Sequence, residues 1–486
     1  MSNDAPDAAP ETAAAPGTPA PGTPAPDTRA PRTAAPAVRL PAGVVTRYAI
    51  GSIGTGGFAT LPGLVLTYYL TDSLGVAALV AGIVITAAKI WDVVIDPVVG
   101  ALSDRELARR GSRRRLMLVG AGTIWLFFAL TFSAPASFGP VVGAGWVLLA
   151  FLLTATSFSL FQVPYIALPA ELTPGYDERT RLLTWRVVVL TLAILLFGAG
   201  GPILRDSTGD PATGYLLMGV VSGVVLTVGM LVATTVAGRA ARAAAPSRAA
   251  SPALPGGIRA HYAAAIATLR RSAPFRALLL TYLLQALATG LMLAGAQYVA
   301  TWVLHSQAAV TLLFVALIAP AFLAAPLWGA VSARTGKERA FAAAGILFGV
   351  AALALLGLQW APGAWAYIPV AVAGVAYAGM QSLPMAMLPD VISHDERTHG
   401  PGRAGAFSGV WTAGETVGFA LGAAVLSLTL AVTGYVSSTA AVTVVQPDAA
   451  VTGIVVAFSA LPAALIALSL VSLRRYRLRR SDIDVG

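Results

Sequence analysis

The stretch PVVGALSDR at residues 97–105 decides the fold, because its pattern returns as PLWGAVSAR at residues 326–334. Both copies fit P-x-x-G-A-x-S-x-R, and each ends a long apolar segment. A second pair agrees with the first: PYIALP and DERT at 164–169 and 177–180 return as PMAMLP and DERT at 384–389 and 395–398. Each copy lies an even number of apolar segments after its counterpart. We therefore expect two similar halves with the same orientation in a membrane.

The chain is too apolar to form a water-soluble surface. Of its 486 residues, 57% are hydrophobic and 11% are charged, so lipid is the expected solvent. A helix needs about 20 apolar residues to cross the hydrocarbon layer. We predict twelve spans, at residues 44–70, 76–103, 115–134, 141–170, 181–204, 214–237, 275–304, 308–333, 338–359, 364–391, 404–433 and 450–473. The expected fold is an all-α integral membrane protein of two six-helix parallel repeats, as in the major facilitator superfamily fold.

Basic residues orient the predicted spans. Thirty of the 32 Lys and Arg residues fall in tails, loops or span ends of one side. Arg205 falls on the other side, and Lys89 lies deep in a span. Because basic residues are retained in the cytoplasm, we predict a multi-pass protein of the cell (inner or plasma) membrane with both termini cytoplasmic. The net charge of +10 then reflects this topology and contact with anionic lipids, not nucleic-acid binding.

The spans divide the chain into five parts. Residues 1–40 are rich in Ala, Pro and Thr, which predicts a disordered cytoplasmic tail. Two six-helix halves at 41–237 and 275–474 flank a cytoplasmic linker at 238–274, and 475–486 form a second tail. The chain has no Cys and four scattered His, so we expect neither a cofactor nor a metal site.

Ionisable residues inside the predicted spans are the main candidates for function, because each costs about 2.5 kcal/mol or more near the bilayer centre. Lys89, Asp92 and Asp96 are three and four residues apart, so they share one stripe of a helix. Two carboxylates one turn apart will share a proton, recruit Lys89 or hold a small cation. A buried ion pair of Lys89 with Asp92, without a transport role, is the alternative.

Other polar residues in the spans are candidate contacts for a solute. Arg186 lies near the start of the fifth span, where it can also reach the membrane interface. Glu415 lies in a Gly-rich span one turn after Trp411. Four glutamines offer hydrogen bonds to a polar solute, although such residues also join membrane helices to one another; they are Gln162, Gln285, Gln297 and Gln381.

A cytoplasmic loop after the second span is predicted to act as a gate. In this loop Asp104 and Arg105 precede a basic run that includes Arg113. An acidic residue at a helix end that faces several arginines can clasp a neighbouring helix and release it when the halves rock. The alternative is that these charges only fix the topology.

These residues together resemble a known family. The stretches that carry the resemblance are YYLTD at 68–72, KIWDVVIDP at 89–97, the segment from Pro164 to Thr173 and the segment from Arg403 to Trp411. Over about residues 44–474 the chain resembles the glycoside-pentoside-hexuronide:cation symporters, the melibiose-permease branch of the major facilitator superfamily. The resemblance implies symport of a sugar-like solute, driven by a proton or sodium gradient, by alternating access.

The resemblance also implies roles for particular residues. Asp92 and Asp96, with the hydroxyl of Ser159 nearby, take the place of the family's cation site. Lys89 and Tyr165 join the candidate solute contacts. Four positions depart from the family pattern: Gly56 and Gln162 stand where similar sugar carriers have Asp, Ile166 where they have an aromatic residue, and Glu415 where they have Lys. The cation pair is retained and galactoside-type contacts are lost, which leaves open another glycoside, a hexuronide, or an amphipathic solute such as a lysolipid or a drug.

Two other functions agree less well with the sequence. A channel would show rings of repeated selectivity residues, which are not visible. An intramembrane prenyltransferase could use Asp92 and Asp96 in an Asp-rich motif for magnesium diphosphate, but a second such motif is missing. We therefore expect a monomeric transporter and not an enzyme, with a small solute, a coupling cation and membrane lipids as its partners.

Overall fold

The computed structural model describes residues 39–173, 176–243, 269–399, 404–439, 444–476 and 478. Most of the predicted tails (1–38, 477 and 479–486) and the middle of the predicted linker (244–268) lie outside these residues, as does Arg403. Twelve helices in the described part are long and apolar enough to cross a membrane, which confirms the predicted number of spans.

The first half begins with α1 (Ala42–Ile50) and α2 (Ser52–Tyr68), which run into a π-helical segment, η1 (Tyr69–Ser73). It continues with α3 (Ala78–Arg110), α4 (Arg114–Thr131), the 3₁₀ turn η2 (Ala136–Phe138), α5 (Gly139–Leu172), α6 (Tyr176–Asp206) and α7 (Pro211–Ala243). The second half comprises α9 (Ala273–Tyr298), the π segment η4 (Val299–Val303), α10 (Ala309–Thr335), α11 (Lys337–Ala354), η5 (Leu355–Gln359), η6 (Ala364–Ala366), α12 (Tyr367–His399), α13 (Ala404–Val432), α14 (Asp448–Phe458) and α15 (Ala460–Leu473).

The predicted gate loop is shorter than expected. Residues 97–105 belong to α3, which ends only at Arg110, so the connection to α4 is three residues long. Gly111 follows with φ +70°, a left-handed conformation that ends the helix and that glycine adopts without strain. Pro97 does not stop α3, because membrane helices tolerate proline where neighbouring helices supply the lost contacts. Both copies of the motif therefore lie on helices, and Asp104 and Arg105, which we expected in a loop, belong to α3.

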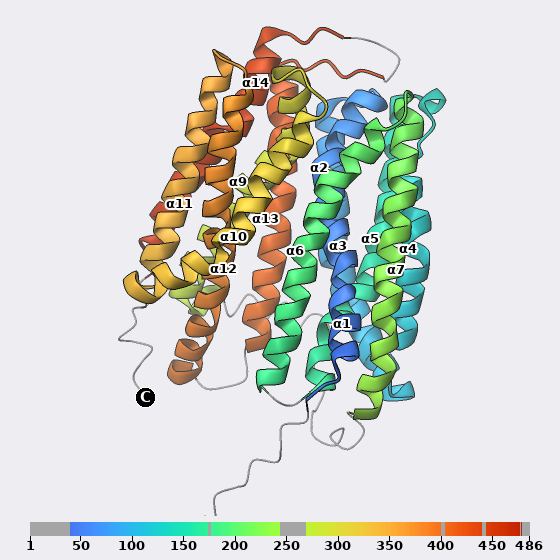
Figure 1. The fold of residues 1–486 in the computed structure, drawn as a ribbon, viewed down its shortest axis with the longest axis vertical. Helices are drawn as coiled ribbons and strands as arrows, with labels where there is room; N and C mark the ends of the chain where they lie inside the picture. Colours follow the sequence, from blue (N-terminus) through green and yellow to red (C-terminus); the bar gives the residue numbers. More distant parts are fainter. Residues whose placement is uncertain are drawn as a thin grey trace, which may run out of the picture. The chain divides into compact units, whose positions relative to one another are not determined.

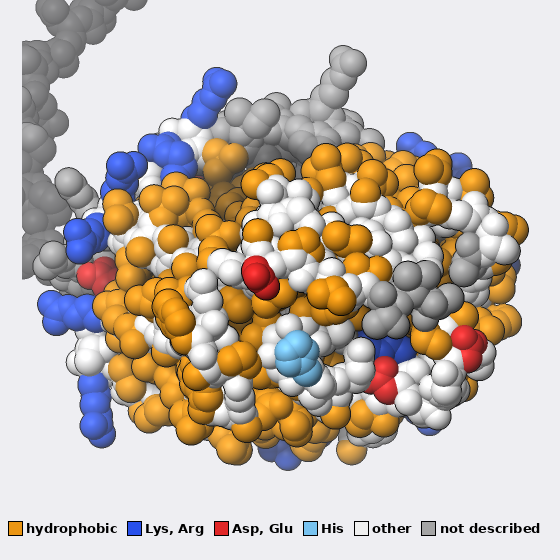
Figure 2. Space-filling model, turned by 90° about the horizontal axis from the view of Figure 1, so that it is seen from above, with side chains coloured by type: hydrophobic (Ala, Val, Ile, Leu, Met, Phe, Trp, Pro, Cys, Tyr) orange, Lys and Arg blue, Asp and Glu red, His pale blue; other side chains and the backbone are white. Residues whose placement is uncertain are grey.

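Two faces of the bundle need names. We call the terminal face the one where α1 begins and α15 ends, together with the connections at Gly111, Thr173 and Gly336. The opposite distal face holds the connections at 74–77, 132–138, 207–210, 304–308 and 360–363 and the described residues 433–439 and 444–447, and lies at the top of Figure 1. Figure 2 looks onto the distal face, where acidic and basic side chains are few among apolar ones.

The two π segments extend the internal repeat. In the first half, the backbone N–H of Leu74 donates to Tyr69 and that of Val76 donates to Leu70. In the second half, Leu304 donates to Val299 and Ser306 donates to Ala300 in the same arrangement. The first span of each half therefore ends in the same unusual turn, and π turns of this kind are frequent at functional sites.

The repeated DERT motif also has a structural reason. In the first half, Glu178 is buried and accepts from the backbone N–H of Leu40, just before α1, at 3.1 Å. In the second half, the buried Asp395 forms an ion pair with Arg271, just before α9. Each copy therefore holds the chain where it enters the first span of its half.

The halves are joined near the distal face. Here α3 lies beside α13, and α6 lies beside α10. Gly82 allows the first contact, because a Cβ at this position would lie 2.5 Å from Ser427 Cβ. Gly198 allows the second, because its Cβ would lie 2.0 Å from the ring of Phe314. Small residues let membrane helices approach closely, and here they bring the two halves together.

Candidate functional site

Lys89, Asp92 and Asp96 of α3 lie together, as their spacing predicts. Lys89 Nζ lies 3.1 Å from Asp92 Oδ2. The same ammonium group lies over the rings of Phe58 and Phe151, at 5.2 and 5.8 Å from their centroids. Cation–π contacts and one ion pair thus hold Lys89 inside the first half. The aromatic rings do not neutralise its charge, so the carboxylate of Asp92 is its main electrostatic partner.

Asp92 and Asp96 retain oxygen atoms with capacity for a ligand. Asp92 Oδ1 is buried and has no hydrogen-bond partner among the described residues. Ser159 on α5 donates to Asp96 Oδ1 at 2.5 Å, while the side chain of Asp96 is otherwise exposed. An unpaired buried carboxylate oxygen is costly, and a proton or a cation would relieve that cost. The arrangement therefore has the hard oxygen ligands that a proton or Na⁺ needs, on two adjacent helices.

Gln162 and Arg186 complete the polar lining of the first half. Thr55 on α2 donates to Gln162 Oε1 at 2.8 Å. Gly56, where similar sugar carriers place an acid, instead packs against α6, because its Cβ would lie 2.8 Å from Ala193 Cβ. The residue of α2 that contacts Gln162 is therefore Thr55, and the sequence analysis considered only its neighbour Gly56. Arg186 lies over the ring of Tyr165 at 5.7 Å, and its buried Nε has no hydrogen-bond partner among the described residues.

Tyr165 itself does not reach a solute in this conformation. Its side chain is fully buried, and its hydroxyl donates to the backbone oxygen of Tyr48 at 2.7 Å. Ser52 Oγ lies 3.0 Å from the same hydroxyl. In this structure its ring packs against the guanidinium of Arg186, and the direct solute contact stays a prediction.

A polar cluster in the second half brings together three of the predicted solute contacts. The hydroxyl of Tyr282 lies 2.7 Å from Glu415 Oε1 and 2.8 Å from Gln381 Oε1. Trp411 stacks on the ring of Tyr282 with centroids 4.4 Å apart. Gln381 also donates to Tyr377 at 2.7 Å. The two tyrosines were missed by sequence analysis, because a tyrosine in a span reads as apolar packing.

Gln285 is separated from this cluster. It is 1% exposed and donates to Ser469 on α15 at 3.3 Å. It therefore lies within the second half, between α9 and α15, and does not face the first half. Because the side chain of Gln285 points toward α15 in this structure, it does not point toward the other half, where we expected the solute.

Of the three predicted gate residues, Asp104 and Arg113 form an ion pair with each other, and Arg105 does not take part. Arg113 bonds Glu171 at the end of α5 at 2.7 Å, Ser103 at 2.6 Å and Asp104 at 2.8 Å. Burial lowers the pKa of Arg113, but its bonds to Glu171 and Asp104 outweigh this and raise the pKa above the usual value. Arg105 is exposed and forms no ion pair among the described residues.

The second half has a matching clasp. Lys337, just after Gly336, donates to Asp390 Oδ2 of α12 at 2.6 Å and to the backbone oxygen of Ala386 at 3.0 Å. In both halves a basic residue after the glycine that ends the second span therefore holds the end of the fourth span. Both clasps lie on the terminal face, and each lies within one half.

A polar network at the distal face was missed by sequence analysis. Asp72 is 7% exposed, and Tyr435 from the other half donates to it at 2.6 Å. Thr71 Oγ1 lies 2.7 Å from the hydroxyl of Tyr298. The backbone N–H of Ser438 donates to the backbone oxygen of Thr71. Asp72 lies in the stretch that carries the family resemblance, but it ends a span, where an acid looks like a loop residue.

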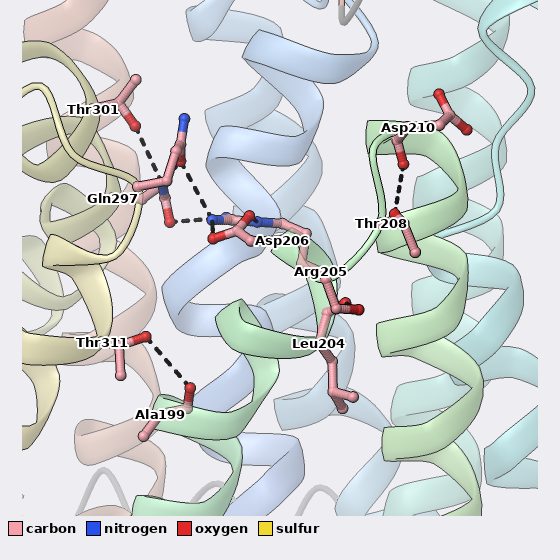
Figure 3. Close-up of polar contacts among 11 residues, drawn as sticks. Ala199, Leu204, Arg205, Asp206, Thr208, Asp210, Gln297, Thr301 and Thr311 are labelled. Carbon is pink, nitrogen blue, oxygen red and sulfur yellow. Dashed lines mark hydrogen bonds and ion pairs between the residues drawn. The ribbon is translucent and has the colours of Figure 1, made fainter.

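Arg205 forms the second part of this network. It is 5% exposed and donates to Gln297 of α9 at 2.8 Å, as Figure 3 shows. Asp206 lies beside its guanidinium, with Oδ1 2.7 Å from Nε. Figure 3 also shows Thr311 of α10 bonded to the backbone oxygen of Ala199. The predicted topology placed Arg205 alone on the side opposite the other loop arginines and lysines. This isolation was the signal in the sequence that could have identified it.

The described residues contain no group of three or more His, Cys, Asp or Glu side chains that could hold a metal ion. The acids instead form small separate sets, which include the α3 stripe, Glu415 in the second half and Asp72 at the distal face. Each is bonded to hydroxyl, amide or basic groups of the chain, as buried polar groups in a membrane protein must be.

Comparison with known proteins agrees with this arrangement. The family model described as MFS/sugar transport protein matches residues 47–480. An uncharacterised symporter of Synechocystis is 35% identical over 32% of this chain and 28% of its own length. The glucuronide carrier protein homolog of Escherichia coli is 23% identical over 89% of this chain and 92% of its own length. The sodium-dependent lysophosphatidylcholine symporter 1 of mouse is 25% identical over 76% and 74%.

Solved structures agree on the fold. The crystal structure of the nucleoside transporter NupG superposes with a TM-score of 0.62 at 13% identity and covers 90% of this chain and 99% of its own. Several of the relatives are matched over less than half of their own length, and the first of them over 28%. The likeness to the solved structure shows a shared fold alone.

Proposed function

The chain belongs to the MFS/sugar transport protein family, a family of membrane transporters and not of enzymes, and from this premise we propose that it is a secondary active symporter. In this proposal a proton or Na⁺ gradient drives the movement of a sugar-like solute. The glycoside-pentoside-hexuronide:cation resemblance is confirmed by this match and by the glucuronide carrier homolog. The coupling ion and the solute are part of the proposal.

One observation carries the coupling step. Asp92 and Asp96 lie on one stripe of α3, Asp92 Oδ1 lacks a partner, and Ser159 already supplies a hydroxyl at Asp96. A cation or proton that binds here removes the cost of the unpaired oxygen and competes with Lys89 for Asp92. Binding therefore changes the partner of Asp92 on α3. A contact that differs between the ion-bound and ion-free states is what couples ion occupancy to conformation.

The arrangement of contacts supports alternating access. The hydrogen bonds described above between the halves lie at the distal face, and the clasps of the terminal face stay within one half. We infer that this conformation is closed at the distal face and open toward the terminal face. The excess of basic residues at the terminal face supports a cytoplasmic position for that face, and in this proposal the solute is released inward from this state.

The solute is proposed to lie between the two polar linings. Arg186 and Gln162 belong to the first half, and Gln381 and Glu415 to the second. The guanidinium of Arg186 forms no ion pair with a described residue, so it is suited to an anionic group on the solute. A hexuronide fits both linings, with its carboxylate at Arg186 and its hydroxyls at the glutamines and Glu415.

A second candidate is an amphipathic solute such as a lysolipid. The observation that favours it is the match to the mouse lysophosphatidylcholine symporter over 76% of this chain. Its phosphate would use Arg186 in the same way, and its acyl chain would need an apolar path. Uptake of a glucuronide and of lysophosphatidylcholine by the same preparation distinguishes the two solutes.

The test is uptake into proteoliposomes that hold the whole chain. A proton or Na⁺ gradient is imposed, and accumulation of each solute is measured with and without it. Asp92→Asn should reduce accumulation to the level seen without a gradient, while solute binding persists. Asp448→Asn, at an exposed carboxylate that begins α14, is the matched control and should accumulate solute normally. Full accumulation by Asp92→Asn would remove Asp92 from the coupling role.

A further inference from the structure

A pocket at the terminal face lies apart from the polar linings described above. It has a volume of about 590 Å³ and lies between the start of α11 and the end of α15. Arg339 and Arg474 line it with Tyr476, and apolar side chains such as Ile346 and Leu470 line the part further from the terminal face. The pocket therefore has a basic mouth and an apolar depth.

The described residues do not neutralise the positive charge of the mouth. Among the described residues neither Arg339 nor Arg474 forms an ion pair, whereas the neighbouring Lys337 is already bonded to Asp390. Among the described residues, Glu338 is the one acid that lines the pocket. Two arginines facing one carboxylate leave a net positive charge, and guanidinium groups bind phosphate oxygens through paired N–H donors.

Tyr476 adds a donor to the same mouth. The chain turns inward after α15, where Arg474 and Tyr476 donate their backbone N–H groups to Leu470 and Leu473. The turn buries the ring of Tyr476 to 7% exposure while Arg474 stays exposed at the rim. Burial, with the nearby charges of Asp390 and Glu338, raises the pKa of Tyr476, so its hydroxyl stays protonated and can donate.

The apolar depth of the pocket continues along the outside of the bundle. Ile346, Val350 and Leu353 are 54%, 62% and 53% exposed, and their spacing places them on one stripe of α11. Leu468 and Val471 of α15 are 55% and 51% exposed. In a protein that spans a membrane these side chains face lipid, so a ligand that enters the pocket can extend along them as an acyl chain does.

We propose that this pocket binds the phosphodiester headgroup of an anionic phospholipid, whose acyl chains run along the exposed stripe of α11. Arg339 and Arg474 bind the phosphate oxygens, and Tyr476 donates a further hydrogen bond. Glu338 accepts from a hydroxyl of the headgroup, so phosphatidylglycerol, which carries two, fits better than a bare phosphate. Basic pockets between membrane helices on the cytoplasmic side are suited to anionic lipid headgroups for these electrostatic reasons.

The experiment measures lipid binding to the purified full chain in detergent. Phosphatidylglycerol is titrated while the melting temperature is followed and retained lipid is counted by native mass spectrometry. Phosphatidylcholine tests the need for net negative charge, and inorganic phosphate tests whether the free anion suffices. Each arginine near a membrane surface contributes about fivefold to binding, so Arg339→Gln with Arg474→Gln should weaken phosphatidylglycerol binding about thirtyfold.

Two further variants keep the result decisive. Ala342→Trp fills the pocket without changing its charge and should also abolish retained phosphatidylglycerol. Arg109→Gln with Arg110→Gln removes two exposed arginines at the end of α3 and should bind lipid as the unchanged chain does. The proposal is overturned if the pocket variants retain phosphatidylglycerol normally, if phosphatidylcholine binds equally, or if inorganic phosphate alone reproduces the rise in melting temperature.

Discussion

Replacing Gly82 by alanine should open the distal face. The Cβ of alanine at this position would lie 2.5 Å from Ser427 Cβ on α13. Carbon atoms in contact prefer about 3.5 Å or more, so α3 and α13 must separate by about 1 Å at this point. Ser427 Cβ moves only with its helix, because it is attached directly to the backbone. Overpacking of this size costs about 1–3 kcal/mol.

The cost falls on one conformation. Only the state with a closed distal face brings Gly82 against Ser427, so the alanine methyl group destabilises that state relative to a distally open one. A cost of about 1–3 kcal/mol raises the open fraction about 5- to 150-fold, since each 1.4 kcal/mol is a factor of ten. The change in population, not a loss of solute contacts, is the expected effect.

The assay uses the absence of cysteine in the natural sequence. Ala81, which is 0% exposed beside Gly82, is replaced by cysteine and labelled with a membrane-impermeant maleimide. The labelling rate of Ala81→Cys should rise about 5- to 150-fold when Gly82→Ala is added. Gly122→Ala is the matched control, because nothing lies within 4 Å of a Cβ there. Equal labelling rates with Gly82→Ala and Gly122→Ala would refute the closed distal contact.

Two other predictions concern the terminal clasp and the second-half cluster. Arg113→Gln should lower stability by about 1–3 kcal/mol, because Glu171 loses its partner, whereas Arg105→Gln should change the melting temperature little. Because the pKa of Arg113 is raised in the folded protein, its contribution to stability is fully present below the pKa of an unfolded arginine side chain. The loss of stability should therefore be equal at about pH 7 and about pH 10 in thermal melts. Tyr282→Phe should weaken solute binding and lower stability by about 1–3 kcal/mol, since Glu415 loses a donor; unchanged binding by isothermal titration would argue against a role for this cluster.

Much of the membrane architecture could be predicted from composition and spacing. Long apolar windows gave twelve spans, because the hydrocarbon layer sets a minimum length that few other structures need. The spacing of three and four residues placed Lys89, Asp92 and Asp96 on one stripe, since helix geometry alone decides which side chains share a face. The family of the chain also followed from such short stretches.

Rotation of each helix about its own axis could not be predicted in this way. Lipid-facing and inward-facing side chains are both apolar, so the periodicity that marks the core face of a soluble helix is weak here. Gln285 therefore looked equivalent to Gln381, yet it points toward α15 while Gln381 joins the cluster at Tyr282. The burial of Tyr165 has the same cause, because its direction depends on Tyr48 and Ser52 of another span.

The sequence by itself determined a twelve-helix membrane protein with a repeated design and a charged stripe on α3. Only the tertiary structure decided which charges meet across the halves. Asp72 and Tyr435 are 363 residues apart in the chain, and Arg205 and Gln297 are 92 apart. Hydropathy and helix periodicity depend on neighbours within a few turns, whereas these contacts depend on how whole helices pack. The closed distal face is therefore a property of the assembled bundle, and no single span encodes it.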